Sequence, residues 1–335
     1  MKNIFFAIIV LSALSCCREH GEIPGLQFAM TVLDSCHVIY PDTVNVSITD
    51  DYINNLYPSR YGYVISNDKI GAIVTVLDTL TLDLKYKFGM KGRGPNEFIS
   101  PILASVDYDK DWVYINDLAK GELSRIVLTE EEAYMDPAYK TGPFYTGWIC
   151  ALDTLCISFS DIEDTPELLL MSSSGFVRKE YIHHLVDDKK IKTPSYFTYS
   201  SSIDMSRQNN LLIAAGLMIP VVMAYSVERN ELIPRWRLFL EPEPYTIEKG
   251  FPLPKKELKW EIIRTYLSAD FIYVSVKKKG TPEGYTYLLK LDYTGKCMNT
   301  YKIACDFYSF LISRDESALL GIAGDMDGCL VRVKL

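Results

Sequence analysis

A turn signal followed by a short β-forming run recurs along this chain of 335 residues. The runs begin at positions 70, 112, 155, 211, 271 and 318, each directly after turn-forming residues such as Asn67-Asp68 or Asn209-Asn210. Successive runs start 42, 43, 56, 60 and 47 residues apart. An interval of about 40–45 residues, enough for four strands, is typical of β-propeller blades. We expect insertions in the two longer intervals, at Asp187–Pro194 and Glu241–Lys259, to form loops.

The sequence contains no convincing amphipathic helix of three turns, so the predicted fold is all-β. Each run is followed by a further predicted strand, for example Thr79–Leu84 in the first unit and Cys329–Leu335 in the last. The last unit ends there, which leaves an open sheet edge. We therefore predict that an N-terminal segment, either Phe28–Leu33 or Val44–Ile48, supplies the missing outer strand and closes the ring.

Residues Phe88–Phe98 read FGMKGRGPNEF and form the most specific motif in the chain. Glycines permit positive φ angles, proline fixes a turn, and the two phenylalanines are apolar anchors. A dinucleotide-binding reading fails because the third glycine is missing, and a P-loop reading fails because no Gly-Lys-Ser/Thr follows. The stretch is therefore predicted to be a structural connector, with its key residues at Gly89, Gly92, Gly94, Pro95, Glu97 and Phe98.

The same stretch, continued through Pro101, Val106-Asp107, Val113–Ile115, Asp117 and Arg125-Ile126, resembles an NHL-type propeller repeat. Together with the N-terminal signal described below, the chain resembles the TolB-like six-bladed propeller lipoproteins of Bacteroidetes. The clear motif covers about 40 residues, the length of one blade. The resemblance implies a six-bladed β-propeller whose motif residues are mostly structural.

The N-terminus predicts export and lipid anchoring. Lys2 precedes the apolar run Ile4–Leu14, which is too short to span a bilayer and fits a signal peptide of residues 1–15. Leu14-Ser15-Cys16 resembles a lipobox, in which the cysteine is lipidated and becomes the new N-terminus. An ordinary signal peptide cleaved nearby is the alternative. Residues 16–25 then form the lipid anchor and tether, and residues 26–335 form the propeller.

Cysteine and histidine patterns do not predict a metal site or a cofactor. The chain has no C-x-x-C motif, and His183 and His184 are adjacent in a strand and so point to opposite faces. Cys150 and Cys156 flank Asp153 in a predicted hairpin and form a possible disulfide; Cys36 and Cys329 would meet if the N-terminal strand closed the last blade. Unpaired buried thiols are the alternative.

Composition and missing motifs narrow the function. The formal charge of −8 disfavours nucleic acid as a partner. The sequence has no G-x-S-x-G, H-E-x-x-H or sialidase-type repeat, so no catalytic residue is assigned. The acidic group Asp161, Glu163 and Asp164 is either a solvated loop or a glycosidase-like pair, since the sequence does not give the separation of its carboxylates.

The leading hypothesis is a non-catalytic lipoprotein of the cell envelope, on the periplasmic face or outer surface of an outer membrane. Its propeller serves as a binding or scaffold module for a protein or glycan partner. The alternative is a hydrolase or lyase that acts on glycans or peptides at a site in the propeller funnel. The uncharged stretch Leu211–Tyr225 is predicted to form two buried strands, with a membrane-dipping loop as the other reading.

Overall fold

The computed structural model describes residues 23–28, 33, 36–44, 53–67, 72–94, 96–108, 110–136, 139–140, 149–152, 155–159, 167–172, 177–182, 201–206, 208–228, 231–280, 284–323 and 329–335. Within these ranges the regular structure is β-strand, and no α-helix occurs. No helix of the described part has the length and hydropathy needed to cross a membrane. The prediction of an all-β fold is confirmed.

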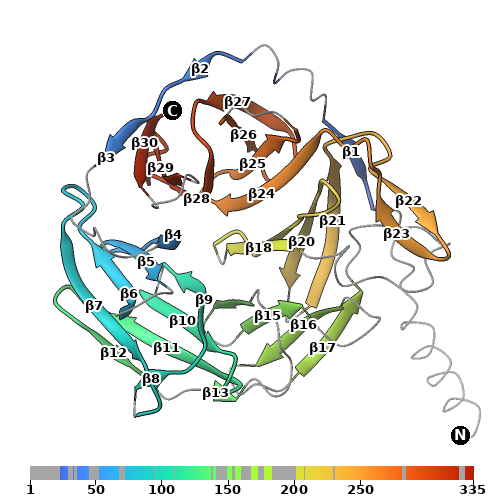
Figure 1. Ribbon diagram of the computed structural model, residues 1–335. Coiled ribbons are helices and arrows are strands. Elements are labelled where there is room, and N and C mark those ends of the chain that lie inside the picture. Colours follow the sequence, from blue (N-terminus) through green and yellow to red (C-terminus); the bar gives the residue numbers. More distant parts are fainter. Residues whose placement is uncertain are drawn as a thin grey trace, which may run out of the picture.

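The sheets stand around a common axis as the blades of a β-propeller (Figure 1). One sheet runs outward as β4 (Ile53–Pro58), β5 (Tyr63–Asn67), β6 (Ala72–Leu77), β7 (Leu84–Lys91) and β8 (Glu97–Phe98). The next holds β9 (Pro101–Asp107), β10 (Trp112–Asp117), β11 (Glu122–Leu128) and β12 (Ala133–Met135), with β13 (Tyr139–Lys140) also paired to β11. Another holds β14 (Ile149–Leu152), β15 (Leu155–Phe159), β16 (Glu167–Ser172) and β17 (Val177–Ile182).

The C-terminal half repeats this order. Its sheets consist of β18 (Ser201–Ser206), β19 (Leu211–Gly216), β20 (Val221–Glu228) and β21 (Glu231–Phe239); of β24 (Trp260–Leu267), β25 (Ile272–Lys278), β26 (Thr286–Leu291) and β27 (Cys297–Ile303); and of β28 (Phe307–Ile312), β29 (Ala318–Ala323) and β30 (Leu330–Lys334). The strands β19 and β20 are almost fully buried, which confirms the two buried strands predicted within Leu211–Tyr225.

The N-terminal belt lies within residues 23–44, and its described parts, residues 23–28, 33 and 36–44, lie along the outside of these last sheets (Figure 1). Its strand β1 (Gly25–Gln27) pairs in parallel with β21, and β2 (Val38–Ile39) pairs in parallel with β27. The strand β3 (Asp42–Val44) pairs antiparallel with β30 and completes that sheet. Of the two segments predicted to play this part, Val44–Ile48 lies closest, but residues 45–48 are outside the described ranges.

Two local predictions are wrong. The predicted strand Thr79–Leu84 is a turn at residues 79–81, and of its residues only Leu84 belongs to a strand, β7. The Asp78 carboxylate accepts the backbone N–H groups of Leu80 and Thr81 and so competes with strand pairing. The predicted run at Ile70–Val76 corresponds, from residue 72 on, to β6, which is the third strand of its sheet, and the fourth is β7.

The predicted loop at Glu241–Lys259 contains a hairpin of β22 (Tyr245–Glu248) and β23 (Phe251–Pro254). Lys249 and Gly250 both have positive φ angles, as the two central residues of a type I′ turn require. The prolines are tolerated because this two-stranded sheet consists of edges only.

Four of the innermost strands contain a β-bulge. The extra positions are Asn54 in β4, Ala104 in β9, Ile263 in β24 and Tyr308 in β28. A bulge bends the strand and re-aims the side chains that follow it. In each case the next residue is polar: Asn55, Ser105, Arg264 and Ser309. Three of these four side chains meet near the axis.

Candidate functional site

The axial cluster comprises six residues of four innermost strands: Asn55, Tyr57, Asp204, Arg264, Tyr266 and Ser309. Arg264 lies at its centre and donates from Nη1 to Asn55 Oδ1 at 2.7 Å and to Ser309 Oγ at 2.6 Å. Its guanidinium carbon lies 4.9 Å from the centroid of the Tyr57 ring, a distance at which a cation is attracted to an aromatic face. The arginine therefore joins the sheets of β4, β24 and β28.

The backbone around Arg264 is held as firmly as its side chain. The fully buried Ser275 accepts the Arg264 N–H at 3.1 Å and donates to the Arg264 carbonyl at 3.2 Å, which satisfies both backbone groups at the bulge. Ser309 Oγ also accepts the N–H of Leu56 at 3.2 Å. The guanidinium is consequently held in a defined orientation. The groups that hold it, an amide and a hydroxyl, are neutral and do not neutralise its positive charge.

Asp204 on β18 is the acidic member of the cluster. Its carboxylate accepts the N–H of Met205 at 2.9 Å and the N–H of Leu267, on the neighbouring sheet, at 2.8 Å. Burial raises the pKa of Asp204 to about 6, although both hydrogen bonds and the charge of Arg264 act in the opposite direction. This carboxyl group therefore changes its protonation state just below neutral pH.

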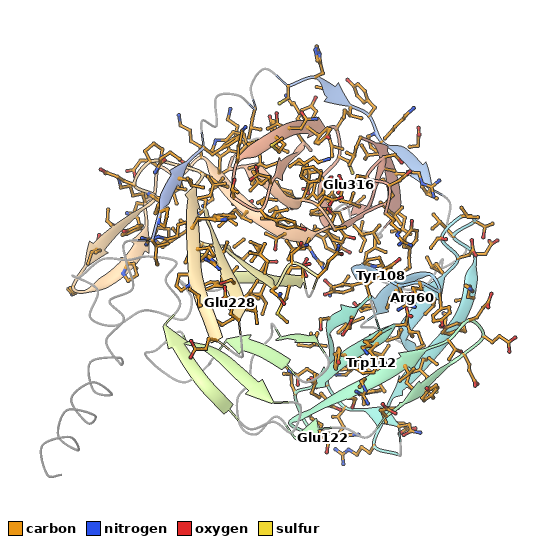
Figure 2. All side chains as sticks on the ribbon, turned by 180° about the vertical axis from the view of Figure 1, so that it is seen from behind. Arg60, Tyr108, Trp112, Glu122, Glu228 and Glu316 are labelled. Atoms are coloured by element: carbon orange, nitrogen blue, oxygen red, sulfur yellow. The ribbon has the colours of Figure 1, made fainter. Side chains whose placement is uncertain are left out.

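Tyr266 lies close enough to the acid for the charge of Asp204 to act on it. Tyr266 donates to the carbonyl of Ile312 at 3.3 Å, and burial raises its pKa, with further contributions from the negative charge of Asp204 and from coupling to the titration of Tyr108 and Tyr63. Tyr108 lies on the inner side of the ring, close to Arg60 (Figure 2). The cluster thus combines one oriented cation, one titratable acid and two aromatic rings that carry hydroxyl groups.

The protonation of Asp204 predicts a pH dependence of stability. Because its pKa is about 6 in the folded protein and 3.8 without burial, the folded state binds this proton more tightly, and the free energy of unfolding should fall as pH rises from about 4 to about 6. We expect the Asp204→Asn variant to lose this slope, as measured by urea unfolding across that window. The matched control is Asp292→Asn: hydrogen bonds from Thr294 and Lys296 outweigh burial and lower the pKa of Asp292, so its loss should matter above pH 4. Equal slopes in wild type and Asp204→Asn would contradict the assignment.

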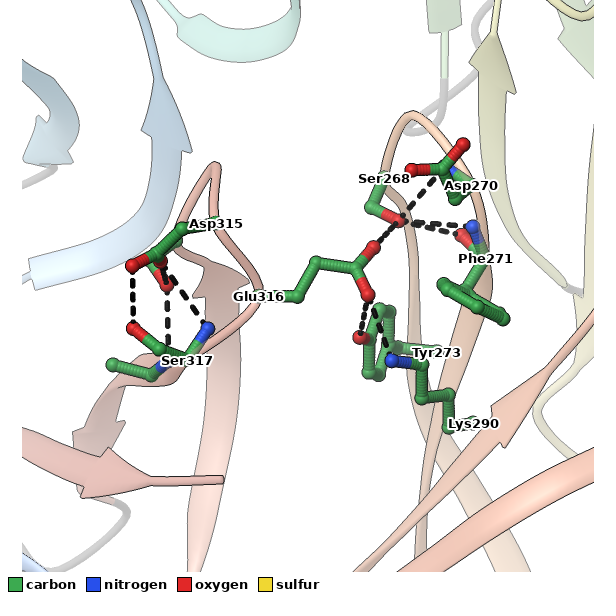
Figure 3. Close-up of polar contacts among 10 residues, drawn as sticks. Ser268, Asp270, Phe271, Tyr273, Lys290, Asp315, Glu316 and Ser317 are labelled. Carbon is green, nitrogen blue, oxygen red and sulfur yellow. Dashed lines mark hydrogen bonds and ion pairs between the residues drawn. The ribbon is translucent and has the colours of Figure 1, made fainter.

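A second polar group, around Glu316, joins the sheets of β24 and β28 (Figure 3). Glu316 accepts hydrogen bonds from Ser268 Oγ at 2.6 Å, Tyr273 Oη at 3.1 Å and Lys290 Nζ at 2.7 Å. The side chains of Lys290 and Glu316 are only 17% and 16% exposed. Each carboxylate oxygen has a partner and little water reaches the pair, so this group acts as a clamp between neighbouring sheets rather than as a reaction centre.

The predicted connector lies at the junction between two sheets. The Glu97 carboxylate accepts the N–H of Gly94 at 2.5 Å, and Gly92 donates to the carbonyl of Phe98 at 2.9 Å. A β-carbon on Gly92 would lie 2.0 Å from Glu97 Oε2, so a larger residue there would displace the Glu97 carboxylate. Gly89 has a φ of 74° and faces the ring of Phe98, which is 2% exposed. Pro95 lies outside the described residues.

The predicted lipidation site and disulfide remain predictions. Cys16 lies outside the described residues, as do Asp161, Glu163, Asp164, His183 and His184. The register of β14 and β15 pairs Cys150 with Ile157 and Cys156 with Ala151, so the two cysteines occupy consecutive rather than opposed positions. Cys36 lies beside β27, where its Sγ is 2.9 Å from Thr300 Oγ1, and Cys329 is an exposed thiol.

The sequence reasoning missed the axial cluster. Arg264 and Asp204 each sit within a β-forming run, in Ile262–Leu267 and Ser201–Ser206, and such residues usually point to solvent. A charged residue in the first strand of a propeller repeat is the available signal, because that strand lines the axis. Within the described part of the chain, no group of His, Cys, Asp and Glu is arranged to hold a metal ion.

No protein-family model matches the chain, and comparison with curated proteins found no match. Solved structures do share its fold. A protein from Bacteroides fragilis that is named as an exported protein aligns at 12% identity over 89% of this chain and 99% of its own, with a TM-score of 0.57. A member of the DUF4221 family from Bacteroides vulgatus aligns at 9% identity over 89% and 96%, with a TM-score of 0.61. U3-55K aligns at 8% identity over 88% and 98%, with a TM-score of 0.53. At these identities the likeness shows the propeller fold alone.

Proposed function

We propose that this chain is an exported lipoprotein of the cell envelope, anchored through Cys16, whose propeller is a non-catalytic binding module for a protein or glycan partner. Three features support export and anchoring: the apolar run Ile4–Leu14, the lipobox-like Leu14-Ser15-Cys16, and the exported-protein name of the structural neighbour from Bacteroides fragilis. Acyl chains contribute about 0.8 kcal/mol per buried CH₂, so two or three of them hold a protein firmly on an outer membrane.

The observation that carries the binding role is the orientation of Arg264. Its Nη1 is occupied by Asn55 and Ser309, while no described residue accepts a hydrogen bond from Nε or Nη2. A cation fixed by neutral partners, with a donor edge left over, is preorganised for a ligand. The residues described in the cluster include one carboxyl group, Asp204, rather than the pair that most glycosidases use.

We further propose that the ring has six blades and is closed by β3, in line with the TolB-like, NHL-type resemblance. The innermost strands support this count, because they contact one another in the cyclic order β4, β9, β14, β18, β24, β28 and back to β4. The pairing of β3 with β30 supports closure by an N-terminal strand.

Metabolic labelling with a clickable fatty acid tests the anchor. We expect wild-type protein to be labelled and to sediment with membranes, and Cys16→Ser protein to be neither. Cys17→Ser is the matched control and should be labelled like the wild type, because the adjacent thiol is a bystander. Labelling that persists in Cys16→Ser would overturn the anchor assignment.

Capture from envelope extracts tests the binding role. Tagged wild-type protein should retain one reproducible protein or glycan partner, and Arg264→Gln should retain less of it, with Arg235→Gln as the surface control. Arg235 is half exposed and pairs with Glu228, away from the axis. Repeated capture with no partner would count against a binding module.

One observation favours the hydrolase or lyase alternative. Asp204, with a pKa of about 6, lies near the charge of Arg264 and the ring of Tyr266, and a carboxyl group protonated near neutral pH is suited to general acid catalysis. Turnover of an envelope glycan or peptide by the wild type that is lost in Asp204→Asn would establish this alternative. Binding without turnover would exclude it for that ligand.

A further inference from the structure

The donor edge of Arg264 has the geometry of an anion receptor. Nε and Nη2 of a guanidinium lie side by side and together donate two parallel hydrogen bonds to the two oxygens of a carboxylate. The contacts to Asn55 and Ser309 occupy the opposite corner of the group, at Nη1, and the Tyr57 ring covers one face. The Nε–Nη2 edge, to which no residue in the described part of the chain offers an acceptor, and the face away from Tyr57 are what a ligand would meet.

The surroundings select among anions. Asp204 acts on Arg264 through its charge, so a doubly charged phosphate would be repelled by the ionised acid more strongly than a singly charged carboxylate. The acid itself is engaged by the N–H groups of Met205 and Leu267 and does not occupy the guanidinium edge through a described hydrogen bond. The site therefore suits one negative charge.

The aromatic residues favour one class of chemical group attached to the carboxylate. Tyr57 and Tyr266 belong to the cluster, and Tyr63 and Tyr108 lie close enough to affect the pKa of Tyr266. Tyrosine combines an apolar ring face with a hydroxyl group, and so matches a sugar, which has apolar C–H faces and many hydroxyl groups. An extended peptide would instead be held by backbone hydrogen bonds, as at an open sheet edge, and no such edge is formed by the cluster.

We propose that Arg264 binds the carboxylate of an acidic sugar, such as a uronic acid unit of a glycan, within the axial cluster. This inference rests on the proposed binding function and specifies its ligand. The carboxylate receives two hydrogen bonds from Nε and Nη2, while the sugar ring lies against the tyrosines.

Calorimetric titration of the full chain in detergent tests the proposal with three probes: a glucuronate-containing disaccharide, the matching glucose disaccharide, and an N-acetylated dipeptide with a free carboxylate. We expect the wild type to bind the glucuronate probe at least tenfold more tightly than either of the others. Arg264→Lys keeps the charge but loses the paired donors, so it should bind about tenfold more weakly. Arg264→Gln should abolish binding, and Arg235→Gln should leave it unchanged.

Asn55→Ala is a control that keeps the test informative if the arginine variants fail to fold. It removes one acceptor at Nη1 but keeps the guanidinium, so it should fold and bind several-fold more weakly through the loss of orientation. Equal affinity for the glucose probe or the dipeptide, or full affinity in both Arg264 variants, would overturn the proposal. A wild type that binds no probe but still captures a partner from envelope extracts would overturn the acidic-sugar ligand and leave the binding function standing. If the wild type binds no probe and also captures no partner, both the acidic-sugar ligand and the binding function are overturned.

Discussion

Deletion of the N-terminal belt, residues 23–44, is expected to abolish the cooperative unfolding transition. The belt places apolar side chains into several separate core clusters, namely those of Leu26, Phe28, Leu33, Ile39 and Val44. A fully buried side chain of this kind contributes about 1.5–3 kcal/mol. Leu33 is fully buried and the other four are partly buried, so together they contribute several kcal/mol, a large share of the roughly 5–15 kcal/mol by which a typical domain is stable. The deletion also leaves the outer edges of β21, β27 and β30 unpaired, which favours aggregation.

Differential scanning calorimetry and urea unfolding measure this effect. Two point variants within the belt show how large a change in the free energy of unfolding a single side chain causes. Leu33→Ala removes a side chain with no exposed surface and should lower the free energy of unfolding by about 2–5 kcal/mol. Tyr40→Ala removes a side chain that is 76% exposed and should change it by less than about 0.5 kcal/mol. A deletion variant that unfolds in a single transition at the wild-type temperature would show that the belt does not contribute to the stability of the propeller.

The repeat of turns and β runs was predictable because it depends on local chemistry. A pair such as Asn209-Asn210 favours a turn on its own, and Asn210 indeed has a positive φ of 47°. The runs that follow, such as Leu211–Gly216, are apolar throughout because both faces of an inner propeller strand are buried. Where a side chain competed with pairing, as Asp78 does, the same local reading placed a strand on a turn.

The belt and the axial cluster were not predictable from local pattern. The strands β1, β2 and β3 are two or three residues long, and β1 pairs in parallel with β21, more than two hundred residues away. No propensity or periodicity specifies such a partner. In the same way Arg264, Asn55 and Ser309 meet only because three strands carry bulges and their sheets pack side by side. Such convergence depends on how the sheets pack against one another, so no single segment of the sequence predicts it.

Replacement of Asp117 by alanine is expected to lower the free energy of unfolding by about 3–5 kcal/mol. Asp117 ends β10, is 1% exposed, and accepts four backbone N–H groups, those of Ile99 at 2.8 Å, Ser100 at 3.1 Å, Ala119 at 3.2 Å and Lys120 at 3.3 Å. The first two belong to the link between β8 and β9, which joins two sheets, and the other two to the turn before β11. Alanine removes the side-chain acceptor of the Ile99, Ser100 and Ala119 N–H groups, whereas the Lys120 N–H also donates to the Asp117 carbonyl and keeps that bond. Each donor left without an acceptor where water reaches poorly costs about 1–3 kcal/mol.

Urea unfolding of Asp117→Ala, Asp117→Asn and Asp292→Ala distinguishes two contributions to the free energy of unfolding: the burial of the carboxylate and the number of hydrogen bonds that it accepts. Asn keeps one acceptor oxygen and should fall between Ala and the wild type. Asp292 also accepts backbone N–H groups, those of Thr294 at 2.9 Å and Lys296 at 3.0 Å, but within one exposed turn. Water replaces its oxygens there, so Asp292→Ala should cost only about 1 kcal/mol. If the two alanine variants lose equal stability, the link between the sheets is not what makes Asp117 important, and the turn alone explains its presence in the motif.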